Sequence, residues 1–586
     1  MSLLKHASRL GSLTRHSLAA ALLTVVAVPL LPAHAAASDN ARVIVRFKAD
    51  SALTRMRALS ASGDAAPERA QLMAQRLGLA LRAGGSIGER SQVIHASGID
   101  SAALAARLAS QPDVELAVVD RRRRALAIPN DPLYLAGGVN GPAAGQWYLR
   151  PPTATTPAAI NAESAWDVTL GSSNVVVAVL DTGIRFDHAD LRPVAVGGNI
   201  LSGYDFISDA ATGNDGDGRD ADPTDPGDWI TAAENSGGPF ANCGVSNSSW
   251  HGTEVIALIG AATDNGFGMA SIGRNVRVLP IRVLGKCGGF DSDILAAMRW
   301  AAGLAVPGVP PNPTPARIIN LSLGAEGSCS SLYSSTIAEV NAQGSIVIAS
   351  AGNSAGHAVS EPANCPGAIG VAATRHVGTK VGFSDLGPEI ALSAPGGNCV
   401  DISPGAACRF PILTARNAGT TVPVAGSSAF SDSFQITVGT SFAAPMVSGT
   451  AALMLSVRPA STPAEIRLLL QQSARPFPTT GGDNGDGSVV PQCQPPGTDS
   501  SGKPIDQLQC YCTTTTCGAG MLDASAAVRA AAGLAPTPSA PIPTPTPTPT
   551  PAPSGGGGGG ALGWPWLLGL LAAVVALGRT RRPRTA

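Results

Sequence analysis

The feature of this sequence that most constrains its fold is a series of short apolar runs that alternate with helical patterns. The runs lie at Val175–Leu180, Val276–Ile281, Ile318–Leu321, Ile346–Ser350 and Ile369–Ala372. Helical patterns lie at Thr253–Gly260, Ser292–Ala301, Ser330–Gln343 and Ser441–Val457. This alternation predicts an α/β fold with a doubly wound, mostly parallel sheet that helices cover on both faces. In such a sheet a functional site lies at the carboxyl ends of the strands.

A smaller pattern precedes this region. Between Ala41 and about Asp120 the chain predicts strands near 42–47, 79–86, 92–96 and 114–119 and helices near 67–77 and 101–110. This βαββαβ order predicts a small α+β domain, a split sheet with two helices on one face. It ends in Arg121–Arg124, which is costly to bury and marks an exposed junction. We interpret residues 36–125 as a propeptide, although a permanent N-terminal binding module would give the same pattern.

Both ends of the chain have the composition of targeting segments. Residues 1–35 combine basic residues, an apolar run and a small-residue cleavage motif at Ala33-His34-Ala35, as in a secretory signal peptide. Residues 534–560 form a Pro/Thr and Gly linker. Residues 561–586 hold an apolar run, Ala561–Gly578, that is long enough to span a bilayer and is followed by arginines. This tail either anchors the protein or, as in the glycine-rich sorting signals of Gram-negative bacteria that it resembles, is removed by a sorting peptidase. Both interpretations predict a secreted or cell-surface bacterial protein.

Charge and cysteine content limit the partners and the cysteine chemistry that can be expected of the central region. Residues 126–533 hold 32 Asp and Glu against 19 Lys and Arg, a net charge of −13, which argues against a nucleic-acid partner and suits bound cations. All ten cysteines lie there, and an exported protein is expected to pair them as disulfides. Neighbouring pairs such as Cys243 with Cys287 are one possible connectivity. A zinc site built from Cys510, Cys512 and Cys517 is the alternative.

A serine lies where a nucleophile could act. Ser441 stands between a small polar turn, Gly439-Thr440, and an Ala-rich helical run. At a helix N-terminus, free backbone N–H groups and the helix dipole would stabilise an anionic tetrahedral intermediate. The same serine could simply cap the helix. The choice depends on whether a base and an orienting acid exist elsewhere in the chain.

Few residues can supply that base and acid. Of the eight histidines, four lie in the central region, and His251 stands at the predicted start of a helix beside Gly252. Asp181 directly follows the apolar run Val175–Leu180, so its carboxylate is expected at the carboxyl edge of the sheet. A buried acid there can hold an imidazole in the required tautomer. Asp181-Thr182-Gly183 could also form only a turn.

Together these segments resemble the motifs of the subtilisin-like serine peptidases. Val179–Ile184, His251-Gly252-Thr253 and Gly439–Pro445 resemble the family's acid, base and nucleophile motifs, in the family's order. The resemblance extends from about Asn130 to Asp523, so residues 126–533 are the expected peptidase domain. Residues 42–120 resemble the family's inhibitory propeptide. Glu254 is a departure, because the family often has a second histidine there.

The resemblance implies a role for each motif residue. Ser441 would be the nucleophile, His251 the general base and then general acid, and Asp181 the acid that orients His251. Asn353 matches the side-chain donor of the oxyanion hole, whose loss costs roughly 3–4 kcal/mol of transition-state stabilisation. An Asx turn after a strand is the alternative for Asn353.

Substrate contacts are also implied by the resemblance. Backbone segments that line the primary specificity pocket correspond to Ser322, Leu323, Gly324, Ala351 and Gly352, beside which a substrate would add as an extended strand. Ser360 and Glu361 fall near the base of that pocket. The sequence does not show whether Glu361 faces the substrate.

Calcium is the expected cofactor, and no organic cofactor is expected. One candidate is a glycine-bent acidic loop that lacks the full EF-hand spacing and could equally be a solvated loop; its carboxylates are Asp215, Asp217, Asp220 and Asp222. The family resemblance implies a second site. Its side-chain ligands would be Asp131, Asp190 and Asn265, and its carbonyl ligands Thr263, Phe267 and Met269.

We therefore predict a secreted serine endopeptidase that acts through an acyl-enzyme and matures by cleavage between about Arg124 and Asn130. Its partners would be protein or peptide substrates, its own propeptide as inhibitor, and a C-terminal sorting peptidase. A surface adhesin or binding protein that retains an inert subtilisin-like fold is the alternative. A kexin-like processing enzyme, which the Arg121–Arg124 run suggests, would cleave strictly after basic residues.

Overall fold

A computed structural model describes residues 41–56, 64–120, 128–135, 144–398, 410–431, 438–482 and 489–535. The chain divides into two compact units between Ala125 and Leu126. Each unit has its own hydrophobic core, and each is described by itself. The expected signal peptide, the Arg121–Arg124 junction, the linker and the C-terminal apolar run lie outside the described residues.

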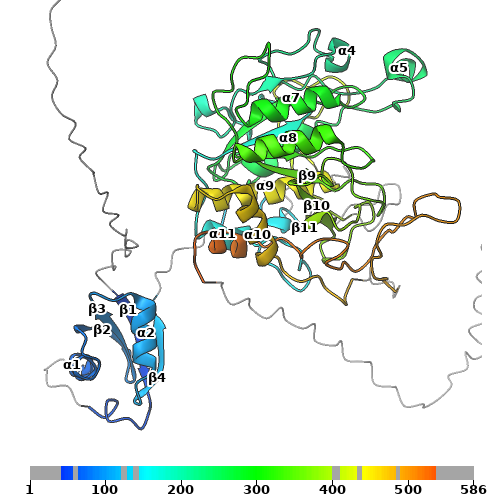
Figure 1. Cartoon of the computed structure of the whole chain (residues 1–586). Helices are drawn as coiled ribbons and strands as arrows, with labels where there is room; N and C mark the ends of the chain where they lie inside the picture. Colours follow the sequence, from blue (N-terminus) through cyan, green and yellow to red (C-terminus); the bar gives the residue numbers. More distant parts are fainter. Residues whose placement is uncertain are drawn as a thin grey trace, which may run out of the picture. The chain divides into compact units, whose positions relative to one another are not determined.

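The N-terminal unit is a four-stranded antiparallel sheet with two helices (Figure 1). Alternate residues of its first strand, Val43, Val45 and Phe47, share one core with Met73 and Leu104 of the helices, so both helices cover the same face. The βαββαβ order is confirmed, and the sheet order is β2-β3-β1-β4. The elements are β1 (Ala41–Phe47), α1 (Ala66–Leu77), β2 (Leu81–Gly88), β3 (Ser91–Ala96), α2 (Ser101–Ala109) and β4 (Val114–Val119).

The second unit is built on a seven-stranded parallel sheet in the order β11-β10-β9-β8-β5-β7-β6. Consecutive parallel strands need crossover connections, and α-helices lie in three of the six connections of this sheet. The strands are β5 (Val176–Asp181), β6 (Tyr204–Asp205), β7 (Arg277–Arg282), β8 (Ile318–Leu321), β9 (Ile346–Ser350), β10 (Ile369–Thr374) and β11 (Ile390–Pro395). A two-stranded ribbon, β12 (Ala415–Arg416) with β13 (Ala429–Phe430), completes the described strands.

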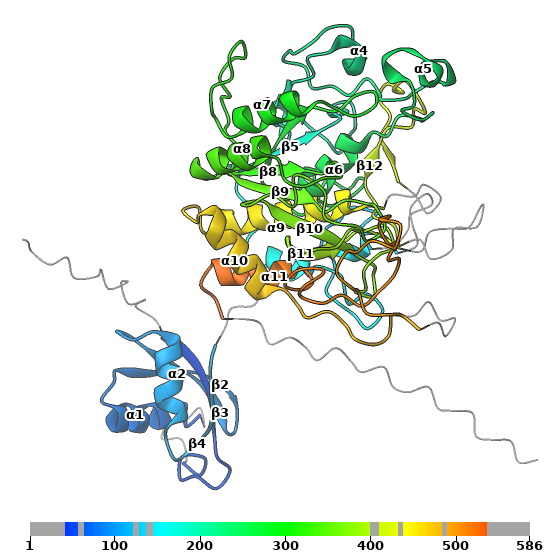
Figure 2. The ribbon, with the colours of Figure 1, turned by 45° about the vertical axis from the view of Figure 1, so that its right-hand side comes forward.

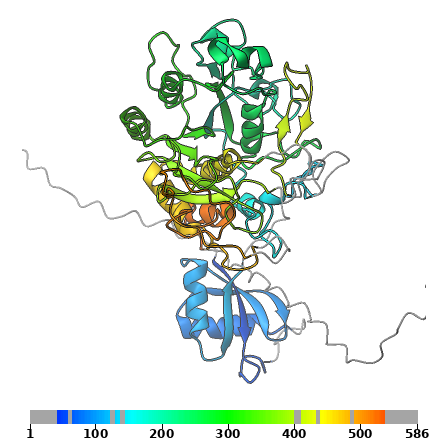
Figure 3. The ribbon, with the colours of Figure 1, turned by 90° about the vertical axis from the view of Figure 1, so that its right-hand side faces the viewer.

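Helices cover both faces of this sheet, as predicted (Figure 2; Figure 3). Side chains of β5 alternate between two cores: Val177 and Val179 face one, and Ala178 and Leu180 face the other. The first core includes residues of α3 (Ala162–Trp166), α6 (His251–Gly260), α9 (Thr440–Val457), α10 (Pro463–Ser473) and α11 (Ala524–Ala531). The second includes residues of α7 (Asp291–Ala301) and α8 (Ser331–Ala342). The short helices α4 (Ala210–Gly213) and α5 (Ala232–Ser236) lie in the loops before α6.

Four disulfides are present among the described residues, where no cysteine is free. They join Cys243 to Cys287, Cys329 to Cys365, Cys493 to Cys510 and Cys512 to Cys517. The expectation of disulfides is therefore confirmed for these eight residues. The zinc alternative is wrong, because each of its three cysteines is bonded to another cysteine. Cys399 and Cys408 lie outside the described residues.

One helix in the described part of the chain is long and apolar enough to cross a membrane by length and composition. This helix is α9, of which 83% is buried inside the second unit. Its apolar character is explained by its position in the core, where it packs against α6, α11 and the sheet.

Candidate active site

Three neighbouring strands place polar residues at the carboxyl edge of the sheet. Asp181 is the last residue of β5, Ser322 directly follows β8, and Asn353 lies three residues after the end of β9. Two helices begin at the same place, α6 at His251 and α9 one residue before Ser441. The sheet topology therefore brings together residues that lie up to 260 positions apart in the sequence.

His251 and Asp181 form a hydrogen-bonded pair. The imidazole Nδ1 lies 2.7 Å from Asp181 Oδ1. Asp181 is 1% exposed and the His251 side chain is 23% exposed, so the acid is shielded while the imidazole retains an open side. Burial by itself would lower the pKa of His251, but the Asp181 carboxylate outweighs it, and the pKa is raised to about 9. Glu254 and Asp228 contribute in the same direction.

The start of α6 is fixed close to the end of β5. A Cβ on residue 252 would lie 2.2 Å from the Gly183 carbonyl oxygen, so only glycine permits this approach. The Gly252 N–H donates to Thr182 Oγ1 at 2.9 Å, and that hydroxyl donates to Asp225 Oδ2 at 2.8 Å. The sequence alone does not indicate a role for Thr182 or Asp225. The Asp-Thr-Gly motif contained a signal for the first of them, whereas Asp225 lies 44 residues beyond Asp181.

Ser441 lies in the first turn of α9 and is held by Ser322. Its Oγ donates to the Ser322 carbonyl oxygen at 3.3 Å, and Ser322 Oγ donates to the Ser441 carbonyl oxygen at 2.7 Å. The ring of the next residue, Phe442, lies 5.8 Å from the His251 ring, centroid to centroid. The imidazole therefore lies beside the helix turn that carries Ser441.

Asn353 is oriented by the residue before the serine. Its Oδ1 accepts hydrogen bonds from the backbone N–H and the hydroxyl of Thr440, both at 3.0 Å. Because Thr440 occupies the amide oxygen, the amide NH₂ is left to bind another partner. The residue is exposed. Thr440 was not assigned a role from the sequence, because its contact with Asn353 spans 87 positions.

The family of this chain follows from a comparison with known proteins. The sequence profile of the "Subtilase family" matches residues 172–501, more than half of the chain and the stretch that holds all these site residues. The chain belongs to the subtilase family.

Individual relatives agree with this subtilase assignment. The "Extracellular protease" of Xanthomonas campestris is 42% identical over 64% of this chain and 57% of its own length. The "Extracellular basic protease" of Dichelobacter nodosus is 38% identical over 63% of this chain and 56% of its own length. A solved protease structure from Pseudoalteromonas arctica is 38% identical, with a TM-score of 0.55, and matches 69% of this chain and all of that one. This chain thus spans somewhat more than half the length of the curated relatives that it matches.

The segments expected to contact substrate flank Ser441 in this subtilase. Residues 322–325 follow β8, and residues 351–354 follow β9. Residues 360 and 361 join them: the Ser360 N–H donates to the Ala351 carbonyl at 2.8 Å, and Glu361 exchanges backbone hydrogen bonds with Ala325 at 2.9 and 3.0 Å. The Glu361 carboxylate accepts the Ser330 N–H at 2.5 Å. The side chain of Glu361 is therefore used to hold the loop before α8.

The residues of the expected second calcium site gather around one loop. Asp131 accepts the N–H groups of Asp264 and Asn265 at 3.0 and 3.4 Å. Asp190 accepts the Asn265 side-chain amide at 2.8 Å and the Met269 N–H at 2.9 Å. Both carboxylates are buried, and burial raises the pKa of each to about 6. A Cβ on Gly268 would lie 2.0 Å from Asp190 Oδ2, so the loop backbone approaches this carboxylate closely. Thr263 and Phe267 belong to the same loop.

The carboxylates of the acidic loop, unlike those around the loop 263–269, do not converge on one place. Asp215 pairs with the buried Arg282, which also lies 2.5 Å from Asp205. Asp220 accepts the Asp222 N–H at 2.7 Å, and Asp222 accepts the Thr224 N–H at 3.1 Å. Asp217 is exposed. Among the described residues, no three acidic groups of this loop offer ligand atoms within 4.8 Å of one another. The guanidinium of Arg282 supplies the positive charge at the base of the loop.

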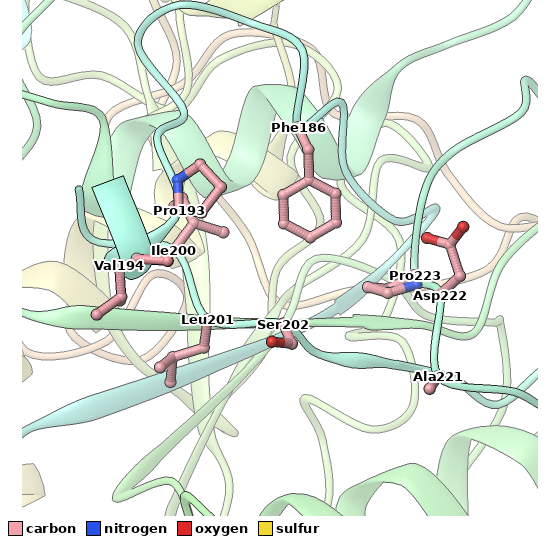
Figure 4. Close-up of a pocket in the computed structure, with 10 residues that line it drawn as sticks. Phe186, Pro193, Val194, Ile200, Leu201, Ser202, Ala221, Asp222 and Pro223 are labelled. Carbon is pink, nitrogen blue, oxygen red and sulfur yellow. The ribbon is translucent and has the colours of Figure 1, made fainter. Parts of the chain in front are cut away.

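A separate cavity of about 360 Å³ lies next to the acidic loop. Figure 4 shows the Phe186 ring and the side chains of Pro193, Ile200 and Pro223 around this space, with the Asp222 carboxylate pointing away from it. None of the site residues Asp181, His251, Asn353 or Ser441 lines this cavity. Its walls are mostly apolar, and it is not where the polar groups of the site converge.

Proposed function

We propose that this subtilase is a secreted serine endopeptidase that hydrolyses peptide bonds through an acyl-enzyme. The observation that carries the proposal is the hydrogen bond of 2.7 Å between Asp181 and His251, beside the helix turn that holds Ser441. The names of the relatives, extracellular proteases, support both the activity and the export.

In the first step the hydroxyl of Ser441 leaves the Ser322 carbonyl and gives its proton to His251 Nε2 as Oγ attacks the substrate carbonyl carbon. Asp181 holds the imidazole by its other nitrogen and stabilises the imidazolium that forms. The negative charge on the substrate oxygen is met by the Asn353 NH₂ and by the backbone N–H of Ser441 in the first turn of α9, which has no acceptor within the helix.

In the second step His251 donates its proton to the leaving amine, and the C–N bond breaks to give an ester on Ser441. Water then attacks the ester with His251 as base and releases the acid product. The substrate lies between residues 322–324 and 351–352, as the resemblance implies, and adds as an extended strand.

Subtilases commonly bind calcium, and we place one structural calcium ion at the loop 263–269. Asp131, Asp190 and Asn265 would hold it with carbonyl groups of the loop; the all-oxygen donor set and the two buried carboxylates fit this cation. Bound calcium would supply positive charge to the two carboxylates. The acidic loop is less suitable, because Arg282 already occupies its base.

We further propose that the N-terminal unit is an inhibitory propeptide, and that the C-terminal tail is a signal for a sorting peptidase or a membrane anchor. The order of domains supports the first part, since a small α+β unit stands between an export signal and the peptidase unit. Mass spectrometry of the secreted protein would test both parts by giving the mature termini.

A serine-directed phosphonate probe tests the proposed chemistry. We expect covalent labelling at Ser441, identified by peptide mapping, and loss of labelling in Ser441→Ala. A binding protein with an inert fold would fold normally, yet it would take up no label at Ser441 and would release no peptides from casein.

A further inference from the structure

A buried carboxylate beside the expected substrate segments has an oxygen atom without a partner. Asp385 is 0% exposed. Its Oδ1 accepts the N–H groups of Ser354 and His357 at 2.9 and 3.1 Å. Its Oδ2, although buried, has no hydrogen-bond partner among the described residues. One oxygen therefore holds the loop that follows Asn353, while the other is free to act on something else.

This free oxygen lies against the wall of the expected substrate channel. A Cβ on Gly352 would lie 2.3 Å from Asp385 Oδ2 and 2.4 Å from Ser360 Oγ. A Cβ on Gly324, in the opposite segment, would lie 3.3 Å from Ser360 Cβ. Ser360 thus lies between the two segments that flank Ser441, and Asp385 lies next to it. The missing side chain at Gly352 lets its backbone lie in contact with both oxygen atoms.

Among the described residues, no lysine donates a hydrogen bond to this oxygen. The closest basic group in the sequence, Lys380, is itself buried, and its Nζ lies within 2.5–3.1 Å of four backbone carbonyl oxygens. An ammonium group has three N–H donors, so those carbonyls use all of them. A buried carboxylate oxygen without a donor is costly, and a cationic ligand would remove that cost.

A second carboxylate lies at the edge of the same channel. Glu326 is exposed, and its Oε1 accepts the Ser354 hydroxyl at 2.9 Å. This hydrogen bond reaches from the segment after β8 to the segment after β9. One acidic group is therefore exposed beside the two segments, and the other is buried next to Ser360.

We propose that Asp385 and Glu326 select substrates that carry lysine or arginine immediately before the scissile bond. The inference rests on the proposed endopeptidase function and names its substrate class. The side chain of that residue would extend from the scissile carbonyl at Ser441 between Gly324 and Gly352. Its cationic end would reach Asp385 and Ser360, and Glu326 would attract it at the rim. The four arginines that precede the second unit are a sequence of this class.

Isosteric variants test the assignment. Peptides that differ only in having Lys, Arg, Leu or Phe before the scissile bond would be compared by kcat/KM. We expect the wild-type enzyme to favour Lys and Arg about tenfold or more over Leu. Asp385→Asn keeps the Oδ1 acceptor for the loop, and we expect it to reduce the Lys-to-Leu ratio about tenfold. Glu326→Gln should reduce the ratio severalfold, less so at high salt, because Glu326 is exposed.

The matched control is Asp499→Asn, which removes one exposed negative charge from another turn and should leave the ratio at its wild-type value. If Asp385→Asn does not fold, the wild-type kcat/KM values for the four peptides and the effect of Glu326→Gln still test the proposal. A wild-type enzyme that cleaves after Leu or Phe and rejects Lys, or an unchanged ratio in both variants, would overturn the inference. Those outcomes leave the endopeptidase function intact, whereas failure of that function would appear as no cleavage of any peptide and no labelling of Ser441.

Discussion

At the scale of single residues, the Asp181–His251 pair would determine the pH range in which the proposed endopeptidase works. His251 must be neutral to accept the proton of Ser441. Since the Asp181 carboxylate, acting against burial, raises the pKa of His251 to about 9, we expect kcat/KM to increase with pH until about pH 9. A pH profile with an uncharged peptide measures this directly.

Glu254 provides a variant for the same prediction. It is buried three residues after His251 on α6, and its negative charge contributes to the raised pKa of the imidazole. Burial raises the pKa of Glu254 to about 7, so the group is ionised at pH 9. Glu254→Gln should therefore move the acidic limb of the profile to lower pH. Glu339→Gln, on the exposed side of α8, should not move it.

Asn353 gives a prediction about the transition state. Its amide oxygen is held by Thr440, which leaves the NH₂ group for the proposed oxyanion. Asn353→Ala should lower kcat about 10²–10³-fold with little change in KM, since the lost contact forms with the oxyanion and not with the ground state. Asn174→Ala, at an exposed turn, is the control. A mainly raised KM would instead assign Asn353 to substrate binding.

At the scale of elements, β8 and α9 are joined by a buried series of hydrogen bonds that ends at Ser441. Ser448 Oγ donates to Asn320 Oδ1 at 2.8 Å, and Asn320 Nδ2 donates to Ser322 Oγ at 3.0 Å. Ser322 then donates to the Ser441 carbonyl. Four polar groups in an otherwise apolar core thus fix the helix against the strand end.

Removing the centre of this series of hydrogen bonds should destabilise the peptidase unit. In an Ser441→Ala background, which prevents self-digestion, Asn320→Ala should lower the free energy of unfolding by about 1–3 kcal/mol, because two buried hydroxyls lose their partner. Ser448→Ala should have a smaller effect of about 1 kcal/mol. Denaturant unfolding measures both. Equal stability of Asn320→Ala and its parent would mean that the series does not secure α9.

The strands and helices that carry the site could be predicted from the sequence because their apolar runs are long and have clear ends. The boundaries agree to within one or two residues for β5, β7, β8, β9 and for α6 to α9. The strands β6 and β11 were not predicted: β6 has two residues, and β11 is a short run that contains Ser393 and ends at Pro395. Neither gives a periodic signal.

The motif residues of the site could also be predicted from the sequence, whereas the residues that hold them in place could not. Asp181, His251, Asn353 and Ser441 each lie at a strand end or helix start that the sequence marks. Thr440, Asn320 and Asp385 act through contacts with residues that are distant in the chain, so no local pattern distinguishes them from ordinary turn or core polar residues. For the acidic loop, calcium stays a prediction from composition, and the pairing of Asp215 with Arg282 could not be predicted because the two residues are distant in the chain.

At the scale of the whole molecule, the loop 263–269 connects the start of the second unit to its core. Asp131 binds this loop, and the Leu133 N–H donates to the Gly268 carbonyl at 2.9 Å. Calcium at this place would secure the new N-terminal arm of the mature enzyme.

Chelation should therefore lower the melting temperature of the Ser441→Ala protein by several degrees, since a ligand at 100 times its Kd stabilises the folded state by about 2.7 kcal/mol. Asp190→Asn should weaken or abolish the response to EDTA. Asp217→Asn, in the acidic loop, should retain the full response. The opposite pattern would assign the calcium ion to the acidic loop.

The proposed role of Ser441 as nucleophile is tested most directly by the fate of the precursor when this serine is replaced by alanine. Wild-type and Ser441→Ala proteins would be expressed with the whole chain, and the size of the secreted product and casein hydrolysis would be measured together. We predict that the wild-type protein loses its N-terminal unit and digests casein, whereas Ser441→Ala accumulates as a folded, unprocessed precursor without activity. Maturation and casein hydrolysis that both persist in Ser441→Ala would contradict the assignment of Ser441 as the nucleophile.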